Sequence, residues 1–309
     1  ETRPWIFYAI LVIFGCARAF SGPASQSFLP QIVSGERLPQ AISVSSSVMQ
    51  VAVISGPALG GLALQVSTSF AFGISLVLFS VVSAVLYGIR IENLPERPVG
   101  AAAVLERVIE GVAFVRKRRE LLGAISLDLF AVLLGGATAL LPFFAQDVLH
   151  VGPAEFGWLR ASPAIGAATM SFWLTAKPLG RYAGAKMFAS VALFGVATVI
   201  FALSENFFLS MACLATLGAA DMVSVNVRHS LTTLATPDHM RGRVSAVNML
   251  FIGASNELGE FRAGVSARLF GAVPAVVWGG VACVGVVMAY VALFPSLRRL
   301  DRFPKPNRG

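Results

Sequence analysis

The sequence predicts an all-α fold, a polytopic bundle of transmembrane helices. Of its 309 residues, 56% are hydrophobic and only 13% are charged, whereas a soluble domain carries about 25% charged residues. The apolar residues also form continuous runs that are long enough to cross roughly 30 Å of hydrocarbon as helices. A transmembrane barrel needs shorter segments of strict apolar and polar alternation, which these runs lack.

Nine apolar runs are long enough to be membrane spans. They are rich in Gly, Ala, Ser and Phe, as packed membrane helices often are. The longest connection divides the first three spans from the last six. The predicted spans are 5–28, 42–64, 69–89, 121–146, 154–176, 186–204, 207–229, 245–266 and 272–294.

The basic residues predict the orientation of the chain in the membrane. Most of the 24 Lys and Arg residues lie on alternate connections, and cytoplasmic connections carry the excess of these residues. We therefore expect the C-terminal tail in the cytoplasm and Glu1 outside. The net charge of +8 does not indicate nucleic-acid binding, because the charges are not gathered on one soluble face. The basic segments are 29–41, 90–120, 177–186, 228–244 and the tail after 295.

The connection 90–120 contains an amphipathic stretch that ends in four basic residues, 116–119. One interpretation is a helix on the inner leaflet, with its basic residues near anionic headgroups. The other is a solvated linker helix. The apolar side consists of Val104, Leu105, Val108, Ile109, Val112 and Val115.

Soluble enzyme chemistry is not expected. The three histidines, 150, 229 and 239, form no HExxH motif, and the chain has no GxSxG elbow. The three cysteines, 16, 213 and 283, lie in apolar runs without a CxxC pair, so they predict neither a disulfide framework nor a metal site. We expect no catalytic residues, no metal and no cofactor.

Ionisable residues inside the predicted spans are the candidates for proton coupling or substrate contact. A charge at the centre of a span costs about 2.5–3.5 kcal/mol on insertion scales, so such residues usually have a function. Glu257 and Glu260 are three residues apart and share a helix face, which favours protonation of one of them. The candidates are Arg18, Asp128, Arg160, Asp221, Glu257 and Glu260.

Within this set, Asp128, Glu257 and Glu260 are the residues that we expect to couple protons or contact substrate. Asp221, together with Arg262, is expected to be structural and to lie nearer a helix end. A direct salt bridge between Asp128 and Arg160 is not expected, because their depths differ by roughly 10 Å.

Small residues in the second span predict close helix packing. Gly56, Gly60 and Gly61 have the spacing that lets two helix backbones approach, and Pro57 should bend the helix. Ordinary membrane packing explains this pattern, and so does a seam between two moving halves.

Three stretches of the chain resemble the major facilitator superfamily, in particular its bacterial efflux branch with the enterobactin exporter and macrolide-efflux proteins. In that family, the Gly56 to Gly61 stretch looks like the antiporter motif of the fifth helix. The stretches are 30–41, with Pro30, Glu36 and Arg37; 55–61; and 236–260, with Pro237, Asp238, Arg241, Gly242, Arg243 and Glu257.

The resemblance implies two six-helix halves joined by a cytoplasmic loop. The nine spans then correspond to helices four to twelve, and helices one to three are expected to be absent. The implied parts are a remnant of the N-terminal half at 1–89, a linker with an amphipathic helix at 90–120, the C-terminal half at 121–296 and a basic tail at 297–309.

The resemblance also implies a function. We expect a monomeric secondary active transporter of the bacterial inner membrane that exports a small amphipathic molecule, of drug or siderophore class, as protons enter. Alternating access about a central site would be the mechanism. A truncated, non-transporting remnant or scaffold protein is the alternative, a membrane enzyme is a third possibility, and uptake instead of export also stays open.

Overall fold

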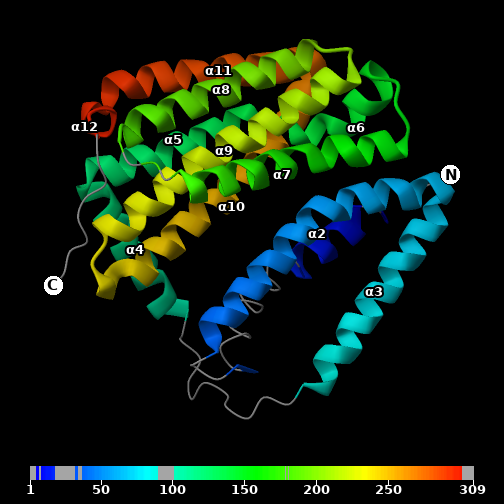
Figure 1. Cartoon of the computed structure of the whole chain (residues 1–309), viewed down its shortest axis with the longest axis horizontal. Coiled ribbons are helices and arrows are strands. Elements are labelled where there is room, and N and C mark those ends of the chain that lie inside the picture. The colour runs from blue at the N-terminus through cyan, green and yellow to red at the C-terminus, as the bar shows by residue number, and fades with distance from the viewer. Residues whose placement is uncertain are drawn as a thin grey trace. The chain divides into compact units, whose positions relative to one another are not determined.

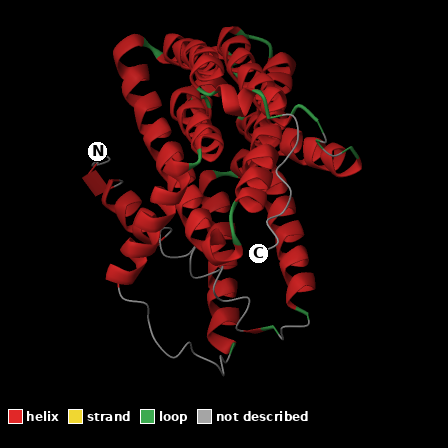
Figure 2. Ribbon diagram, turned by 90° about the vertical axis from the view of Figure 1, so that its left-hand side faces the viewer, coloured by secondary structure: helices red, strands yellow, loops and turns green. Residues whose placement is uncertain are grey.

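The computed structural model describes residues 5–6, 8–17, 32–33, 37–89, 101–177, 179 and 181–300. Every regular element in this part of the chain is a helix (Figure 2). The sequence predictions for Arg18, for residues 90–100 and for residues 301–309 lie outside the described residues.

The chain divides into two compact units. The smaller unit consists of Glu1–Ala52 and Gly73–Pro98, and the larger of Val53–Phe72 and Val99–Gly309. Two long helices, α2 (Leu38–Val66) and α3 (Thr68–Gly88), each contribute residues to both units. The smaller unit also contains the short apolar helix Tyr8–Ala17.

The larger unit is a bundle of long helices (Figure 1). Within it α9 packs between α7 and α8, α11 packs on α8 and α5, and α10 packs on α5 and α4. A broken segment of η1, α6 and η2 follows α5, and α12 ends the bundle. The elements are α4 (Ala101–Lys117), α5 (Arg119–Gly135), η1 (Thr138–Leu140), α6 (Leu141–Phe143), η2 (Phe144–Val148), α7 (Pro153–Ala176), α8 (Ala183–Leu203), α9 (Phe207–Ala235), α10 (Asp238–Phe270), α11 (Ala272–Leu293) and α12 (Pro295–Arg298).

Six helical segments in the described residues are long and apolar enough to cross a membrane. Helices α7 and α10, of 24 and 33 residues, are long enough for a span but are not among these six. These elements begin and end within several residues of the predicted spans. The six segments are Val44–Val66, Thr68–Gly88, Arg119–Val148, Ala183–Leu203, Phe207–Ala235 and Ala272–Leu293.

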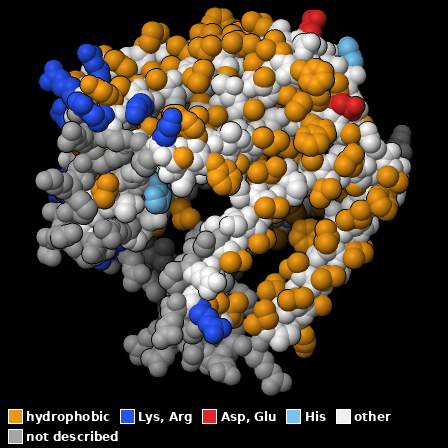
Figure 3. Space-filling model, in the orientation of Figure 1, with side chains coloured by type: hydrophobic (Ala, Val, Ile, Leu, Met, Phe, Trp, Pro, Cys, Tyr) orange, Lys and Arg blue, Asp and Glu red, His pale blue; other side chains and the backbone are white. Residues whose placement is uncertain are grey.

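The surface of the larger unit is apolar along the helices and basic at one end. Figure 3 shows apolar side chains spread over the helices, whereas Lys and Arg gather at the end that holds α12. Large apolar side chains such as Phe172 and Trp278 are 79% and 68% exposed, a pattern that suits lipid as the surrounding solvent.

Two apolar clusters fill the interior of the larger unit. The first includes Leu121, Met187 and Leu231, and it lies toward α4 and α12. The second includes Phe144 and Phe201, and it lies toward α6 and the start of α9. Phe194 of α8 packs against both clusters, so the middle of the bundle lies between them.

The amphipathic stretch in the linker was interpreted as a helix on the inner leaflet. The contacts of helix α4 correct this interpretation, because the helix packs against the bundle. Val115 is buried in the first apolar cluster, and the partly buried Val108 and Val112 pack against that cluster. A Cβ at Gly111 would collide with the Arg243 carbonyl of α10, so the two helices are in close contact. The described part of the apolar side therefore covers protein rather than lipid, although Ile109 is exposed.

Candidate ion-coupling site

A buried ion pair joins α5 to α9. The carboxylate of Asp128 contacts the guanidinium of Arg228, and the two side chains are 7% and 5% exposed. Arg228 was expected at the start of the basic connection 228–244, but it lies inside α9, which continues for two turns beyond it to Ala235. Asp128 therefore has its partner on α9, and the pair neutralises two charges inside the bundle.

The fourth predicted span, the first after the linker, is not one continuous helix. Helix α5 ends at Gly135, and Gly136 has φ −24° and ψ 49°, outside the helical conformation. The predicted span 121–146 is therefore interrupted, and its second part is made of η1, α6 and η2. A helix end inside a membrane leaves backbone carbonyls that need hydrogen-bond donors.

Arg262 of α10 supplies donors at this break. Its Nε donates to the Leu133 carbonyl at 2.8 Å, and its Nη2 donates to the Leu134 carbonyl at 2.6 Å. The guanidinium is thus fixed on the last turn of α5, where a positive charge also complements the helix dipole.

A cavity of about 200 Å³ lies beside the break. It is bounded by the break, by Phe194 of α8, by Asp221 and Gly218 of α9 and by Asn256 of α10. Most of the wall is apolar, with a carboxylate, an amide and a hydroxyl among the polar groups. The lining residues are Val132, Gly135, Gly136, Ala137, Thr138, Pro163, Phe194, Leu217, Gly218, Asp221 and Asn256.

Asp221 has a different environment from Asp128. It lies at the midpoint of α9, not near a helix end as expected, and its half-buried side chain makes no hydrogen bond or ion pair with any described residue. The residue lines the 200 Å³ cavity and also a second, much smaller void. Asp221 is therefore a carboxylate inside the bundle whose charge has no protein partner among the described residues.

The smaller void measures about 10 Å³ and separates Asp221 from the ion pair. Asp128, Asp221 and Ser224 supply its polar groups, and apolar residues such as Ala131 and Val191 supply the rest. Ser224 is 2% exposed, and its Oγ has no hydrogen-bond partner among the residues that the structure describes. A void of this size with three polar neighbours fits one water molecule.

The other predicted site residues lie apart from these two cavities. Glu257 and Glu260 are exposed on α10, and Arg160 is exposed on α7. No ion pair joins Arg160 to Asp128, because Asp128 contacts Arg228. Exposed charges on a membrane helix are more favourable next to water than next to lipid, so we expect these residues to face water rather than hydrocarbon.

The glycine motif of α2 makes a close helix contact at one of its glycines. Within the larger unit, a Cβ at Gly157 of α7 would collide with the Pro57 carbonyl, and one at Gly61 would collide with the Pro153 carbonyl. By contrast, a Cβ at Gly56 or Gly60 would meet no atom within 4 Å. Gly61 therefore allows the approach to α7, whereas Gly56 and Gly60 are not needed for it.

The connector motif lies at the start of α10. Pro237 caps this helix, and Arg243 forms an ion pair of 2.6 Å with Glu110 of α4. Gly242 has open space around it. The structure describes Asp238 and Arg241 only as part of the helix backbone.

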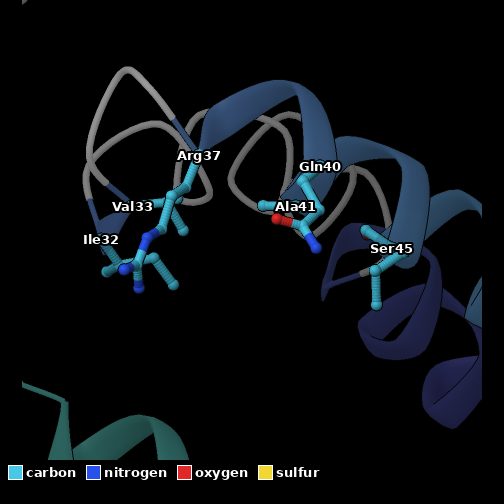
Figure 4. Close-up of a pocket in the computed structure, with 7 residues that line it drawn as sticks. Ile32, Val33, Arg37, Gln40, Ala41 and Ser45 are labelled. Carbon is cyan, nitrogen blue, oxygen red and sulfur yellow. The ribbon is translucent and has the colours of Figure 1, made fainter.

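A larger pocket, of about 690 Å³, lies in the smaller unit at the start of α2. Figure 4 shows Arg37 beside Ile32 and Val33, with Gln40 and Ser45 further along the helix. It is an open surface hollow with a single charged side chain. It therefore gives less indication of ion coupling than the cavities around Asp221.

Sequence reasoning missed three parts of the site. Arg228 was predicted to lie in a connection, and Ser224 was not among the predicted site residues. The break after α5 was not predicted, because it lies inside an apolar run. One signal was available, because Asp221, Ser224 and Arg228 have the spacing i, i+3 and i+7 that places residues on one helix face. The pair Gly135-Gly136 was a signal for the break.

Long apolar helices around a buried ion pair and a cavity are typical of a multi-pass membrane protein of the transporter class. The model of the Major Facilitator Superfamily matches residues 2–260 of the chain. The chain belongs to this family, and the resemblance seen in the sequence is confirmed.

Three relatives indicate the branch of the family. The multidrug efflux pump Tap of Mycolicibacterium fortuitum is 27% identical over 96% of this chain and 75% of its own length. The enterobactin exporter EntS of Shigella boydii serotype 4 is 24% identical over 89% and 66%. A Na(+), Li(+), K(+)/H(+) antiporter of Planococcus maritimus is 22% identical over 81% and 64%. These similarities support secondary transport and efflux over the alternative of a non-transporting scaffold.

Proposed function

We propose that this transporter exports a small amphipathic molecule across the bacterial inner membrane in exchange for protons, and that Asp221 is the carboxylate that binds the proton. The observation that carries the proposal is that Asp221, beside the 200 Å³ cavity, has no ion-pair or hydrogen-bond partner among the described residues. An unpaired carboxylate inside a membrane protein is costly when charged, and protonation removes that cost.

The same reasoning disfavours Asp128 as the coupling group. Its charge is compensated by Arg228, and protonating Asp128 would leave a buried guanidinium without a partner. Asp221 has no such partner among the described residues, so it gains and loses a proton without breaking an ion pair. Glu257 and Glu260 are exposed and remain candidates for contact with substrate.

The cavity beside Asp221 suits the polar end of an amphipathic substrate. Substrate and proton would then compete for one carboxylate, which is the simplest basis for exchange. The break in the α5 segment supports this location, because interrupted helices are common at the binding sites of secondary transporters. The basic end of the bundle supports a cytoplasmic C-terminus.

The similarity to these relatives supports both the proposed direction of transport and the proton as the coupling ion. Tap is named as an efflux pump and EntS as an exporter, and the Planococcus protein is named as an antiporter that exchanges alkali cations for protons. Together they favour export over uptake and proton exchange over uncoupled movement.

The proposal is tested with the full-length protein in proteoliposomes under an imposed proton gradient. Radiolabelled erythromycin, a macrolide, and enterobactin, a siderophore, are the transport probes. We expect the wild-type protein to accumulate at least one probe, and Asp221→Asn to accumulate neither above the level of protein-free vesicles. Asp147→Asn removes an exposed carboxylate outside the cavity and should transport like the wild type. Gradient-driven accumulation by Asp221→Asn at the wild-type rate would overturn the proposal.

A further inference from the structure

A separate pocket of about 250 Å³ lies at the basic end of the larger unit, where α5 begins, α9 ends and α12 closes the bundle. It shares no lining residue with the cavities around Asp221. Arg118, Arg119, Glu120 and Ser296 supply its polar groups, and its other lining residues are apolar. The pocket is several times larger than the roughly 30 Å³ that one water occupies in the liquid, so it has room for a larger polar group.

The charges in this pocket favour an anion. Arg118 and Arg119 are exposed, and neither forms an ion pair with a described residue. The Arg118 guanidinium lies 5.2 Å from the centre of the Phe114 ring, a contact that holds the side chain but leaves its charge unneutralised. Glu120 is the single carboxylate in the lining, so the lining has a net charge of +1. That charge complements a phosphodiester, which carries one negative charge.

Two kinds of hydrogen-bond donor complete the pocket. The Oγ of Ser296 is buried and has no partner in the described structure, and a buried hydroxyl without a partner costs free energy. In addition, α5 begins at Arg119 without a side-chain cap. The N–H groups of its first turn have no acceptor within the helix, and they lie at the positive end of the helix dipole. Both kinds of donor suit the oxygens of an anionic group.

The level of the pocket along the helices indicates where its ligand comes from. The apolar span that contains α5 starts at Arg119, and the span of α9 ends at Ala235; both residues line the pocket. The pocket therefore lies at the boundary between the apolar spans and the basic end of the bundle. Phospholipid headgroups occupy this level of a membrane, and basic pockets between helix ends are suited to bind them.

We propose that this pocket binds the phosphate group of an anionic phospholipid. Arg118 and Arg119 contact the phosphate oxygens, and the Ser296 hydroxyl donates a hydrogen bond to one of them. A bound headgroup would join the start of α5 to α12 at one end of the bundle. The inference is independent of proton exchange at Asp221, because the two sites share no residue.

The experiment is native mass spectrometry of the purified, delipidated full-length protein with dioleoyl phosphatidylglycerol. Each bound lipid adds a resolved mass, so the dissociation constant of the first lipid is measured directly. Two comparison probes separate the parts of the ligand. Dioleoylglycerol has the same acyl chains without the phosphate, and inorganic phosphate has no acyl chains. We expect phosphatidylglycerol to bind about tenfold or more tightly than either probe.

The test variant combines Arg118→Gln with Arg119→Gln and should weaken the binding of phosphatidylglycerol about tenfold or more. Ser296→Ala should weaken it about threefold or more, because one hydrogen bond is lost. The matched control combines Lys177→Gln with Lys186→Gln. These exposed lysines do not line the pocket, and they flank the connection from α7 to α8, which bonds to Leu300 beside α12. The control removes the same charge and should bind the lipid like the wild type.

Several results would overturn the proposal. Wild-type affinity in the double arginine variant would do so, and an equal loss in the double lysine variant would show only a diffuse attraction to the basic end. Inorganic phosphate that binds as tightly as the lipid would contradict the assignment to a headgroup, and equally tight dioleoylglycerol would contradict the role of the phosphate. If the double arginine variant does not fold, Arg118→Gln and Arg119→Gln are tested singly, and wild-type affinity in both would overturn the site.

Discussion

Removing the carboxylate of Asp128 is expected to destabilise the protein strongly. The variant Asp128→Asn leaves the guanidinium of Arg228 buried, in a residue that is 4% exposed, without its counter-charge. Breaking a buried ion pair by removing one partner costs about 3–5 kcal/mol, because the remaining charge is not solvated. We expect a loss of unfolding free energy in that range.

A double variant distinguishes the loss of the ion pair from the cost of leaving a single charge buried. Replacing both residues by apolar ones of similar size, Asp128→Leu with Arg228→Met, removes both charges at once. Such replacements are often neutral or stabilising, so the double variant should be more stable than either single variant. The free energy of unfolding is measured by denaturant titration of the full-length protein in detergent micelles.

An exposed ion pair in the same bundle provides the matched control. Glu110 and Arg243 join α4 to α10 with side chains that are 43% and 37% exposed. Exposed pairs contribute about 0.2–1 kcal/mol, so Glu110→Gln should lower the unfolding free energy by no more than that. A cost below about 1 kcal/mol for Asp128→Asn, or a double variant as unstable as the singles, would refute the reasoning about the buried pair.

Two further predictions concern the packing of the bundle. Gly157→Val should destabilise the protein by about 1–3 kcal/mol, because its side chain would collide with the Pro57 carbonyl of α2. Gly56→Val, at a position with open space, is its control and should cost less; equal costs would contradict the assignment of the close contact. Arg262→Ala should lower the unfolding free energy by about 1–3 kcal/mol per unsatisfied carbonyl, because two carbonyls at the end of α5 lose their donor. Arg262→Lys should restore part of that loss, and equal stability of the wild type and Arg262→Ala would show that the break does not depend on this arginine.

The long helices could be predicted from the sequence because lipid imposes a simple length rule. The predicted starts at residues 207 and 272 coincide with the starts of α9 and α11. The glycines of α2 also predicted a close contact, although only Gly61 makes one. These features depend on local composition, which a single sequence contains.

The site was harder to predict because it depends on contacts between distant parts of the chain. Asp128 and Arg228 lie on helices that are far apart in the sequence, and nothing local indicates that their side chains meet. For the same reason, Asp128 was expected to couple protons and Asp221 to be structural. The structure supports the reverse proposal, since Asp128 has a partner and Asp221 has none among the described residues.

Proton-coupled export through Asp221 requires a linkage between substrate binding and proton binding at this carboxylate. Its most direct test is the release of protons when erythromycin or enterobactin binds to the purified full-length protein in weakly buffered detergent solution. Reciprocal linkage predicts that a bound probe displaces protons from the wild type, whereas Asp221→Asn releases none even at probe concentrations high enough to offset its weaker binding. Equal proton release from the wild type and Asp221→Asn would contradict a linkage at Asp221.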